Sequence, residues 1–483
     1  MGSALPLAFA PFDLWPLAFI LPAGLIWLLD RDLPLRVVFS IGLWFGLGYF
    51  GFGVYWIYNS LHDFGQAPPV VAGGLTTLLI AYLALYPAAT LTVWSYARRS
   101  LGSIALWLLP SLWFSFEWLK GWVITGMPWL SLGYSQTDSP LAGFAPVVGV
   151  YGISAICILG SVVLILLIRD RRYSMLSLIV AIPFAGWLLL QVSWSQPTDS
   201  LRVTMVQGNI PQEVKWQGGQ QQAIFNTYWR ETNLHWESDL IIWPETALPG
   251  NLVRIEDKLL RPMQQAVIEN STAIMSGVIG VEPDGSAFYN SLILLAEERT
   301  LYHKRHLVMF GEYYPMRWLL DFFSGLILIP YSDLTPGPER QSQMRVHDLV
   351  FGVSICFEDA FSRDIFLDLP GANILVNVSN DAWFGDSTAP HQHLQIARMR
   401  SLESQRPMLR STNTGVSAFI DHKGEIGTQS EQFKTESISA IVSGRSGVTL
   451  FVYFLQIQGF LAVLILLTIL LVCVRTGHRN PSI

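Results

Sequence analysis

The sequence predicts a chain of two parts, an α-helical domain that crosses a membrane several times and an α/β domain outside it. Of the 483 residues, 51% are hydrophobic and 14% are charged, whereas about 25% of the residues of an average soluble protein are charged. Five long apolar runs contain no charged residue, and residues 200–446 alternate short β-rich runs with helix-like stretches. This composition excludes a disordered chain. It also argues against a purely soluble protein, because polar groups could not cover the surface.

The five apolar runs are each long enough to cross a bilayer, which takes about 20 residues of helix. They cover residues 37–56, 70–94, 147–168, 175–192 and 450–474. Residues 14–29 and 101–116 form two shorter candidate spans. Residues 1–13 are too short to span, and they lack the basic segment of a signal peptide. The stretch 117–146 mixes aromatic, glycine and polar residues, so we expect an interfacial or re-entrant segment there.

The distribution of arginine predicts the orientation of the spans. Alternate loops carry the residues Arg31, Arg36, Arg98, Arg99, Arg169, Arg171, Arg172, Arg475 and Arg479. In the other loops, residues 57–69 hold no Lys or Arg, and residues 117–146 hold Lys120 alone. Because Lys and Arg are enriched in cytoplasmic loops, we expect the arginine-bearing side in the cytoplasm. The long region 193–449 is then outside, which in a bacterium means the periplasm or the cell surface.

We therefore expect four parts along the chain. Residues 1–192 hold about six spans and an N-terminal stub, residues 193–448 form the outer domain, residues 449–474 form the last span, and residues 475–483 form a cytoplasmic tail. The β-rich runs of the outer domain cover residues 202–206, 239–243, 273–279, 292–295, 350–355, 374–378 and 417–420. The helix-like stretches cover residues 217–235, 257–270 and 391–403. Apolar strands of this kind are expected where helices cover a sheet.

Charge, cysteine and histidine content exclude several kinds of site. The net charge is −6, all of it contributed by residues 201–483, and no basic face is evident, so we expect no nucleic-acid partner. Three cysteines cannot form a disulfide framework. The close histidine pairs, His303 with His306 and His391 with His393, lack the cysteine or carboxylate set of a zinc site. No glycine-rich nucleotide-binding loop is present, so we expect neither a metal nor a cofactor.

Three residues of the outer domain could carry chemistry, and each has a plain structural alternative. Cys356 follows the run 350–355 and precedes acidic residues, which suits a nucleophile on a turn, although a buried structural cysteine is as common. Glu245 follows the run 239–243 and a proline. Ligands gather at such sheet ends, although a solvated or helix-capping glutamate fits as well. Lys304 lies in a basic run, which usually means a solvated face.

Taken together, these residues and their neighbours resemble a known family. W-P-E-T at residues 243–246, H-K-R-H-L-V at 303–308, F-G-E at 310–312 and S-I-C-F-E at 354–358 resemble the nitrilase (carbon–nitrogen hydrolase) superfamily, which uses Glu, Lys and Cys in this order. Further motifs resemble the apolipoprotein N-acyltransferase family. They are Q-G-N-I-P-Q at 207–212 followed by Lys215 and Trp216, N-V-S-N-D-A-W-F-G at 377–385, R-S-T-N-T-G at 410–415, L-A-F-A-P-F-D-L-W-P at 7–16 and W-x-x-T-G-M-P-W-L at 122–130. The resemblance covers essentially the whole chain.

The resemblance implies a nitrilase-type α-β-β-α sandwich on the periplasmic side of a helical domain in the bacterial inner membrane. It implies transfer of an acyl chain from a phospholipid, with phosphatidylethanolamine as the expected donor. The acceptor is the α-amino group of the diacylglyceryl-cysteine at the N-terminus of an apolipoprotein, and this is the last step of lipoprotein maturation. A ping-pong mechanism would pass through a thioester on Cys356. Glu245 would act as general base and acid, and Lys304 would stabilise the oxyanion. We expect a monomer.

The resemblance also places further residues around the site. Glu312 and Glu358 match acidic positions that are expected to orient Lys304 and tune its charge, with a plain salt bridge as the alternative. Candidates for lining a water-poor cleft, with ordinary core packing as the alternative, are Trp216, Phe357, Trp383 and Phe384.

The chain departs from the family pattern at two places. Many members have tyrosine where this chain has Phe357, so any role of that hydroxyl group is absent here. The family usually has eight spans, and residues 1–9 match only the end of the first. The sequence is compatible with a start further upstream and with a shortened first helix.

Two other functions are compatible with parts of this pattern. A membrane-tethered amidase or hydrolase would use the same three residues with water as the acceptor. A receptor with an inactive nitrilase-like domain would be expected to have lost at least one of them. A transporter is disfavoured because the spans contain almost no ionisable residue. We further expect the loops 325–338 and 380–390 to act as lids over the site.

Overall fold

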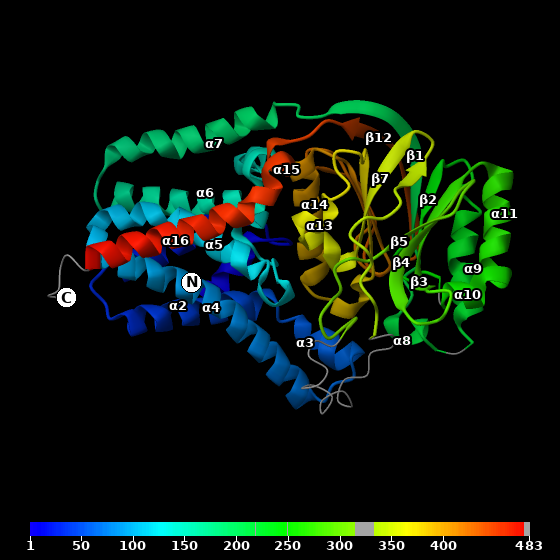
Figure 1. Cartoon of the computed structure of the whole chain (residues 1–483), viewed down its shortest axis with the longest axis horizontal. Coiled ribbons are helices and arrows are strands. Elements are labelled where there is room, and N and C mark those ends of the chain that lie inside the picture. Colours follow the sequence, from blue (N-terminus) through cyan, green and yellow to red (C-terminus); the bar gives the residue numbers. More distant parts are fainter. Residues whose placement is uncertain (218, 249, 314–332, 478–483) are drawn as a thin grey trace. The chain divides into compact units, whose positions relative to one another are not determined.

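The computed structural model describes residues 1–217, 219–248, 250–313 and 333–477, and it divides into two compact units (Figure 1). The helical unit comprises Met1–Ile57, Val70–Ser193 and the chain from Leu450 onwards. The sandwich unit comprises Trp194–Thr449 together with Tyr58–Pro69, a short segment that leaves the helical unit between two of its helices. Most of the predicted tail 475–483 and residues 325–332 of the predicted lid 325–338 lie outside the described residues.

The helical unit consists of apolar helices and short 3₁₀ turns. Its helices are α1 (Leu17–Leu29), α2 (Leu35–Gly53), α4 (Pro69–Leu101), α5 (Leu109–Lys120), α6 (Ala145–Ile168), α7 (Leu176–Leu190), α15 (Leu450–Phe454) and α16 (Gln458–Gly477). Among the described residues, five helical stretches are long and apolar enough to cross a membrane, namely Leu35–Gly53, Pro69–Lys120, Pro140–Ile168, Tyr173–Leu190 and Leu450–Ile469. The five long apolar runs predicted from the sequence are therefore confirmed as helices.

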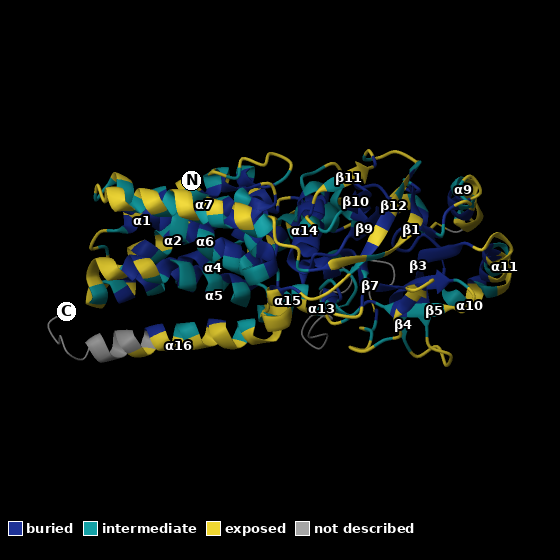
Figure 2. Ribbon diagram, turned by 90° about the horizontal axis from the view of Figure 1, so that it is seen from above, coloured by how far each residue is buried: buried dark blue, intermediate teal, exposed yellow. Residues whose placement is uncertain are grey.

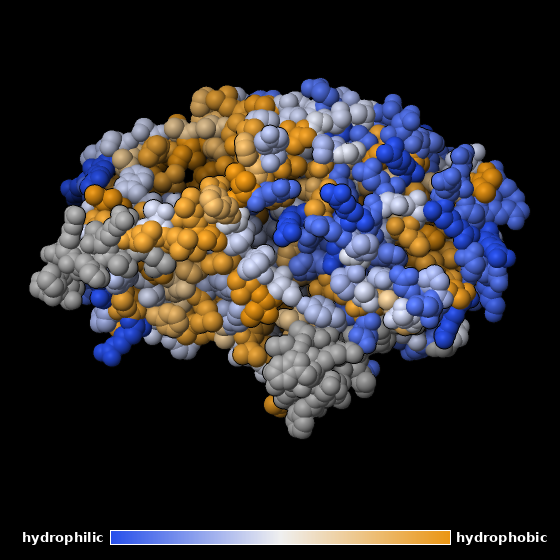
Figure 3. Space-filling view, in the orientation of Figure 1, coloured by the Kyte–Doolittle hydropathy of each residue, from blue (hydrophilic) through white to orange (hydrophobic). Residues whose placement is uncertain are grey.

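The surface of the helical unit is apolar. Large side chains such as Trp44 (74% exposed), Val180 and Phe460 point outward. Exposed residues follow α7 and α16 in Figure 2, and hydrophobic side chains gather over the helices of this unit in Figure 3. Soluble proteins rarely expose apolar patches of such extent, whereas the hydrocarbon core of a bilayer solvates them. This surface is that of a membrane protein.

Small residues allow α2 and α4 to approach closely. A Cβ atom added at Gly42 would lie 2.7 Å from the Cα atom of Ala88, and one added at Gly46 would lie 2.6 Å from the Cα atom of Ala84. The four residues form two small-xxx-small patterns that face each other. Such patterns bring helix backbones together in membranes, where association depends on packing because lipid is as apolar as the helix surface.

The segment between α5 and α6 is irregular, and its helical content is limited to the 3₁₀ turns Val123–Thr125, Leu132–Gln136 and Pro140–Phe144. Helix side chains satisfy its backbone groups. The Tyr49 hydroxyl donates to the Leu130 carbonyl (2.6 Å), Lys120 Nζ donates to the Trp129 carbonyl (2.9 Å), and Glu117 accepts from the Leu132 N–H (2.9 Å). Backbone groups in apolar surroundings need such partners, so these three side chains explain how a non-helical segment is tolerated there.

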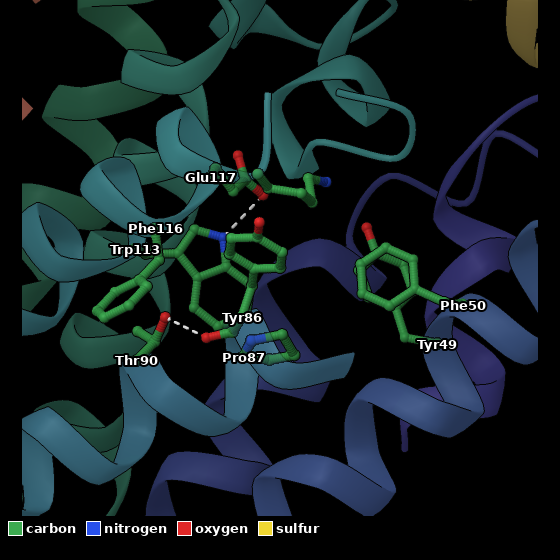
Figure 4. Close-up of a pocket in the computed structure, with 9 residues that line it drawn as sticks. Tyr49, Phe50, Tyr86, Pro87, Thr90, Trp113, Phe116 and Glu117 are labelled. Carbon is green, nitrogen blue, oxygen red and sulfur yellow. Dashed lines mark hydrogen bonds between the residues drawn. The ribbon is translucent and has the colours of Figure 1, made fainter. Parts of the chain in front are cut away.

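A small cavity lies beside these side chains (Figure 4). Its volume is about 20 Å³, which is enough for one water molecule. The Trp113 indole donates to Glu117 (2.9 Å), and the Thr90 hydroxyl donates to the Tyr86 carbonyl (2.8 Å). The residues lining it are Tyr49, Phe50, Tyr86, Pro87, Thr90, Trp113, Phe116, Glu117 and Lys120.

The sandwich unit stacks two six-stranded sheets between helices. The strand order is β12-β1-β2-β3-β4-β5 in the first sheet and β11-β10-β9-β8-β7-β6 in the second. The strands are β1 (Gln196–Gln207), β2 (Leu240–Ile242), β3 (Ala273–Val281), β4 (Phe288–Leu295), β5 (Thr300–His303), β6 (Met344–Val346), β7 (Leu349–Ile355), β8 (Ile374–Ser379), β9 (Met408–Thr412), β10 (Ala418–Ile420), β11 (Ile426–Gln429) and β12 (Glu436–Ser446).

Helices cover the outer face of each sheet (Figure 1). The first sheet is covered by α9 (Gln221–Thr232), α10 (Leu252–Ile255) and α11 (Arg261–Asn270), and the second by α13 (Ser362–Ile365) and α14 (Ala389–Ser404). In β2, Leu240 and Ile242 face the core between the sheets, while Ile241 faces the core under the helices, because successive strand side chains point to opposite faces. The predicted α-β-β-α sandwich with an α-helical membrane domain is confirmed.

Parallel pairing brings several strand ends to one edge. β7 pairs in parallel with β8, and β8 pairs in parallel with β9. In the first sheet, β2 is parallel to both β1 and β3. Residues that follow these strands are therefore grouped at the carboxyl ends of the sheets, where ligand sites of α/β folds form.

All seven β-rich runs predicted from the sequence coincide with strands, and the three helix-like stretches coincide with α9, α11 and α14. The sequence does not predict β5, β6, β9, β11 or β12. β5 is four residues long and runs directly into the basic stretch at Lys304. The charged residues there hide the apolar pattern that would indicate a strand. β12 lies at the sheet edge with a mostly polar or half-exposed pattern.

Candidate active site

Cys356 lies directly after β7, at a sharp turn. Its φ of 53° is left-handed, a conformation that is strained for a residue with a side chain, and a 3₁₀ turn (Cys356–Ala360) begins there. Asn377 Nδ2 donates to the Cys356 carbonyl at 3.1 Å. Burial and the nearby Glu245 carboxylate raise the pKa of the Cys356 thiol above its ordinary value, and Lys304 opposes this rise only in part. The thiol is therefore protonated at neutral pH.

Glu245 is placed by the end of β2 and by a glycine on the next strand. The Asn290 amide donates to its Oε1 at 2.7 Å. The chain turns at Thr246, whose φ is 48°, and a Cβ atom at Gly277 would lie 2.2 Å from the Thr246 nitrogen. Only glycine fits at position 277, because any side chain there would displace the turn that carries Glu245.

Lys304 follows β5 and is 1% exposed. Its Nζ lies 2.9 Å from Glu312 and 3.9 Å from Glu245 Oε1. Asn290 Nδ2 also donates to Glu312 at 2.8 Å, so one amide bridges the two carboxylates. Burial alone would lower the pKa of Lys304, but the carboxylates of Glu312 and Glu245 outweigh it and raise the pKa above its ordinary value. Lys304 is therefore a permanent cation between two carboxylates.

Glu358 has a different set of contacts from Glu312. It is buried, and its carboxylate accepts from the backbone N–H groups of Ile355 (2.8 Å), Arg305 (2.7 Å) and His306 (3.2 Å). It thereby ties the residues that follow Lys304 to the turn at Cys356. Burial raises the pKa of Glu358. The structure thus joins Lys304 to Glu245 and Glu312 and brings Cys356 close enough to interact electrostatically with Glu245 and Lys304. Glu358 is bonded to backbone N–H groups instead.

A buried network that the sequence does not suggest lies behind Cys356. His393 Nε2 lies 3.0 Å from Asp359 and its Nδ1 lies 3.0 Å from Asp381. Arg410 bonds to both carboxylates, at 3.3 Å and 3.0 Å. Burial and Arg410 lower the pKa of His393, but Asp359 and Asp381 outweigh them and the pKa is raised. His393 Nε2 also approaches the Cys356 carbonyl at 3.3 Å. From the sequence, His393 stands out only in the pair with His391, which the sequence disfavours as a metal site.

The aromatic residues predicted to line a cleft are all partly exposed. Phe357 packs edge-on against Phe361, with ring centroids 5.1 Å apart. Phe384 lies 6.4 Å from the His393 ring. Trp216 directly follows Lys215 at the end of the short helix α8 (Gln212–Lys215).

The predicted lid 380–390 is bonded to the segment Tyr58–Pro69. Ser60 donates to the Trp383 carbonyl at 2.8 Å, and Asn59 donates to the Phe384 carbonyl at 3.3 Å. The Phe64 ring meets the Trp383 ring edge-on at 6.1 Å. These contacts join residues more than 300 positions apart, which no local pattern in the sequence reveals. The described part of the other predicted lid reaches Lys304, because the Gly337 N–H donates to the Lys304 carbonyl at 2.8 Å.

The described residues contain no group of three His, Cys, Asp or Glu side chains that could hold a metal ion. The charged groups at the site are instead bonded to one another and to amide groups. The arrangement can supply a thiol nucleophile, a carboxylate base and a fixed cation within one buried cluster. These are the groups that acyl transfer through a covalent intermediate requires.

Comparison with known proteins agrees with this geometry. Residues 1–163 match the family described as apolipoprotein N-acyltransferase N-terminal domain, and residues 202–447 match the carbon–nitrogen hydrolase family. The apolipoprotein N-acyltransferase of Methylococcus capsulatus is 40% identical over 93% of this chain and 90% of the relative. That of Coxiella burnetii is 37% identical over 97% of this chain and 98% of the relative. That of Photobacterium profundum is 36% identical over 93% and 89%.

These matches extend over both units and confirm the resemblance stated from the motifs. With its apolar helices, the protein is an integral membrane enzyme of the carbon–nitrogen hydrolase superfamily. The chain belongs to the apolipoprotein N-acyltransferase family.

Proposed function

We propose that this enzyme moves an acyl chain from a phospholipid to the α-amino group of the S-diacylglyceryl-cysteine at the N-terminus of an apolipoprotein, through a thioester on Cys356. One observation carries the proposal. Lys304 lies between Glu245 and Glu312, next to a cysteine held in a strained turn at a strand end. The names of the relatives support the reaction class.

In the first half-reaction the Cys356 sulfur attacks the ester carbonyl carbon of the phospholipid. The raised pKa of the thiol means that a base must take its proton during the attack, and Glu245 is the proposed base. The carbonyl oxygen becomes an oxyanion, which the Lys304 ammonium group stabilises. Collapse of this intermediate breaks the ester C–O bond, and Glu245 returns the proton to the leaving lysophospholipid.

The second half-reaction runs the same steps with an amine. The α-amino group of the diacylated apolipoprotein attacks the thioester carbonyl carbon, and Glu245 takes a proton from the nitrogen. The C–S bond then breaks and Glu245 returns the proton to the sulfur, which leaves the N-acylated lipoprotein and the Cys356 thiol. Trp216, Phe357, Trp383 and Phe384 are the proposed residues that keep water from the thioester.

Both substrates are lipids, which accounts for the membrane spans. Removing an acyl chain from the bilayer costs about 0.8 kcal/mol per CH₂ group, so a site fixed at the membrane surface avoids that cost. The arginine distribution supports an inner-membrane protein with residues 193–448 in the periplasm and residues 1–192 and 449–474 in the membrane. We take phosphatidylethanolamine as the donor and a monomer as the active form.

Product analysis tests the choice of acceptor. The purified enzyme would be incubated with phosphatidylethanolamine of known chain length, with and without a diacylated lipopeptide. Transfer predicts an N-acylated lipopeptide in amounts that match the lysophospholipid released, and little free fatty acid when the lipopeptide is absent. Free fatty acid formed at the same rate in both samples would identify a hydrolase and contradict the proposal.

A further inference from the structure

Lys215, at the end of α8, is a second buried lysine at the site. It is 2% exposed, and its Nζ donates to the Glu245 carbonyl oxygen at 3.0 Å. Among the described residues it forms no ion pair, in contrast to Lys304, which is bonded to Glu312. Nζ carries three N–H groups, and this carbonyl is the one acceptor that the described contacts give it. Burying a charge without a counter-ion is costly, so the presence of Lys215 beside Glu245 calls for an explanation.

The charge of Lys215 is coupled to the reacting groups. Burial lowers the pKa of Lys215 to about 8, and the nearby Glu245 and Cys356 oppose this fall. These two groups reach it from the ends of β2 and β7. Lys304, the other cation near Glu245, comes from the end of β5. At neutral pH most molecules therefore hold a positive charge at position 215.

We propose that Lys215 is a second cation of the site, which acts with Lys304 to stabilise the negative charge formed on the substrate oxygen when Cys356 attacks. This inference rests on the proposed function. Like that function, it concerns an ester carbonyl group of a phospholipid.

A charge count over Glu245, Glu312, Lys304, Lys215 and Cys356 gives the reason for a second cation. The count starts from two carboxylates, two ammonium groups and a neutral thiol. During attack the C–S bond forms, the carbonyl π electrons move to oxygen, and the thiol proton passes to Glu245. The negative charge has then moved from Glu245 to the oxygen, and the summed charge of these five groups and the substrate stays zero throughout. Without Lys215 the oxyanion would form in a cluster with one excess negative charge, beside a lysine already bonded to Glu312.

Three variants separate charge from hydrogen bonding. Lys215→Met removes both, Lys215→Gln keeps an N–H donor for the Glu245 carbonyl without charge, and Lys215→Arg keeps both. The exposed Lys434, whose side chain pairs with Glu431 at the surface, gives the control Lys434→Met. Thermal unfolding in detergent would check that each variant is folded. The rate of acyl-enzyme formation from phosphatidylethanolamine would be measured by quenched-flow mass spectrometry at several lipid concentrations and pH values.

The inference predicts that Lys215→Met and Lys215→Gln lower kcat for acylation by roughly 100-fold, the usual effect of losing one oxyanion-stabilising group, with KM changed by less than about threefold. Lys215→Arg recovers much of the rate. In the wild type the rate falls as pH rises past about 8, where Lys215 loses its proton, and in Lys215→Arg this fall is absent. Equal rates for Lys215→Gln and Lys215→Arg would mean that Lys215 acts only as a hydrogen-bond donor and not through its charge. A change in KM alone would mean that Lys215 binds the phospholipid head group. Either result would overturn the inference.

Alkylation of Cys356 by iodoacetamide gives a readout that needs no lipid. A nearby cation favours the thiolate, so Lys215→Met and Lys215→Gln are expected to slow alkylation of Cys356 by about tenfold at pH 7, where Lys215 is charged. The rate is measured on the Cys356 peptide, and Lys215→Arg and Lys434→Met are not expected to change it. A wild type that forms no acyl-enzyme but shows this pattern would refute the proposed function and leave Lys215 as a cation of the site. Unchanged alkylation together with unchanged acylation in Lys215→Met would refute the inference alone.

Discussion

The ammonium nitrogen of Lys304 lies 2.9 Å from the carboxylate of Glu312, and both side chains are buried or nearly so. Breaking a buried pair by removing one partner is costly, because the other charge is left without compensation. The pair thus fixes a cation at the site in one position and keeps it charged. We therefore expect Glu312 to affect the reaction although it has no proposed role in proton transfer.

Replacing Glu312 with glutamine is expected to slow acyl-enzyme formation by roughly 10- to 100-fold. The change removes the carboxylate that does most to raise the pKa of Lys304. The pKa therefore falls, and the loss of rate grows as pH rises. The measurement is the rate of acylation between pH 6 and pH 9, with the exposed Glu298→Gln as control. A rate equal to the wild type across this range would show that the ion pair is dispensable.

The thiol of Cys356 is expected to alkylate slowly at neutral pH. Burial and Glu245 raise its pKa, so the thiolate fraction stays small until the pH is well above the ordinary cysteine pKa of about 8.5. In Lys215→Arg, which keeps its charge above pH 8, alkylation of the Cys356 peptide should keep rising through pH 9 without a plateau, whereas the same cysteine in denatured protein should level off. A plateau below pH 8 in the folded enzyme would mean a pre-formed thiolate and would remove the need for Glu245 as base.

His393 is expected to stabilise the sandwich unit as a cation. His393→Gln leaves two buried carboxylates facing Arg410 alone, and breaking such a network costs roughly 3–5 kcal/mol. The pKa of His393 is raised by folding. Its contribution is therefore fully present below the ordinary histidine pKa of about 6.5 and is lost as pH rises through the folded value.

Thermal unfolding of His393→Gln at pH 6 and pH 8.5 checks the direction of this pH dependence. The difference in stability from the wild type should be larger at pH 6. The exposed His347→Asn serves as control and should show no such dependence. A deficit that grows with pH would mean that His393 is neutral in the folded enzyme.

Gly277→Ala is expected to lower activity much more than a typical strand substitution. The added methyl group would lie 2.2 Å from the Thr246 nitrogen and 2.6 Å from the Glu245 Cα atom, so the turn that carries Glu245 must move. Misplacing a catalytic group by about 1 Å can cost roughly 100-fold in rate. Gly427→Ala is the matched control in β11, because its nearest contact is an ordinary 3.8 Å. Wild-type kcat in Gly277→Ala would show that the position of Glu245 is not critical.

Much of the fold could be predicted because the apolar runs in the sequence are long and clearly bounded. Continuous uncharged runs mark the membrane helices, and runs such as 350–355 mark strands buried on both faces. The strand β5 could not be found in this way, since it is short and adjoins the charges around Lys304. Its pairing with β4, a contact made in three dimensions, fixes it as a strand.

Part of the candidate site could likewise be predicted from the sequence, and part could not. Glu245 and Cys356 stand directly after predicted strands, so their emergence at sheet ends follows from the pattern. Sequence alone does not show that Lys304 is buried, because a basic run usually faces water, and it became a candidate through the motif resemblance. The network of His393, Asp359, Asp381 and Arg410 joins four separate segments, and no spacing in the sequence predicts it. Lys215 stood in a quoted motif, but its burial beside Glu245 is visible only in the structure.

The most direct test of the account is the mass of the intact protein after incubation with phosphatidylethanolamine of one known chain length and no acceptor. The account predicts a gain of one acyl chain on the wild type, located on the Cys356 peptide, absent in Cys356→Ala and discharged on adding a diacylated lipopeptide. An acyl group that still forms in Cys356→Ala, or transfer to the lipopeptide without any acylated enzyme, would contradict the thioester on Cys356.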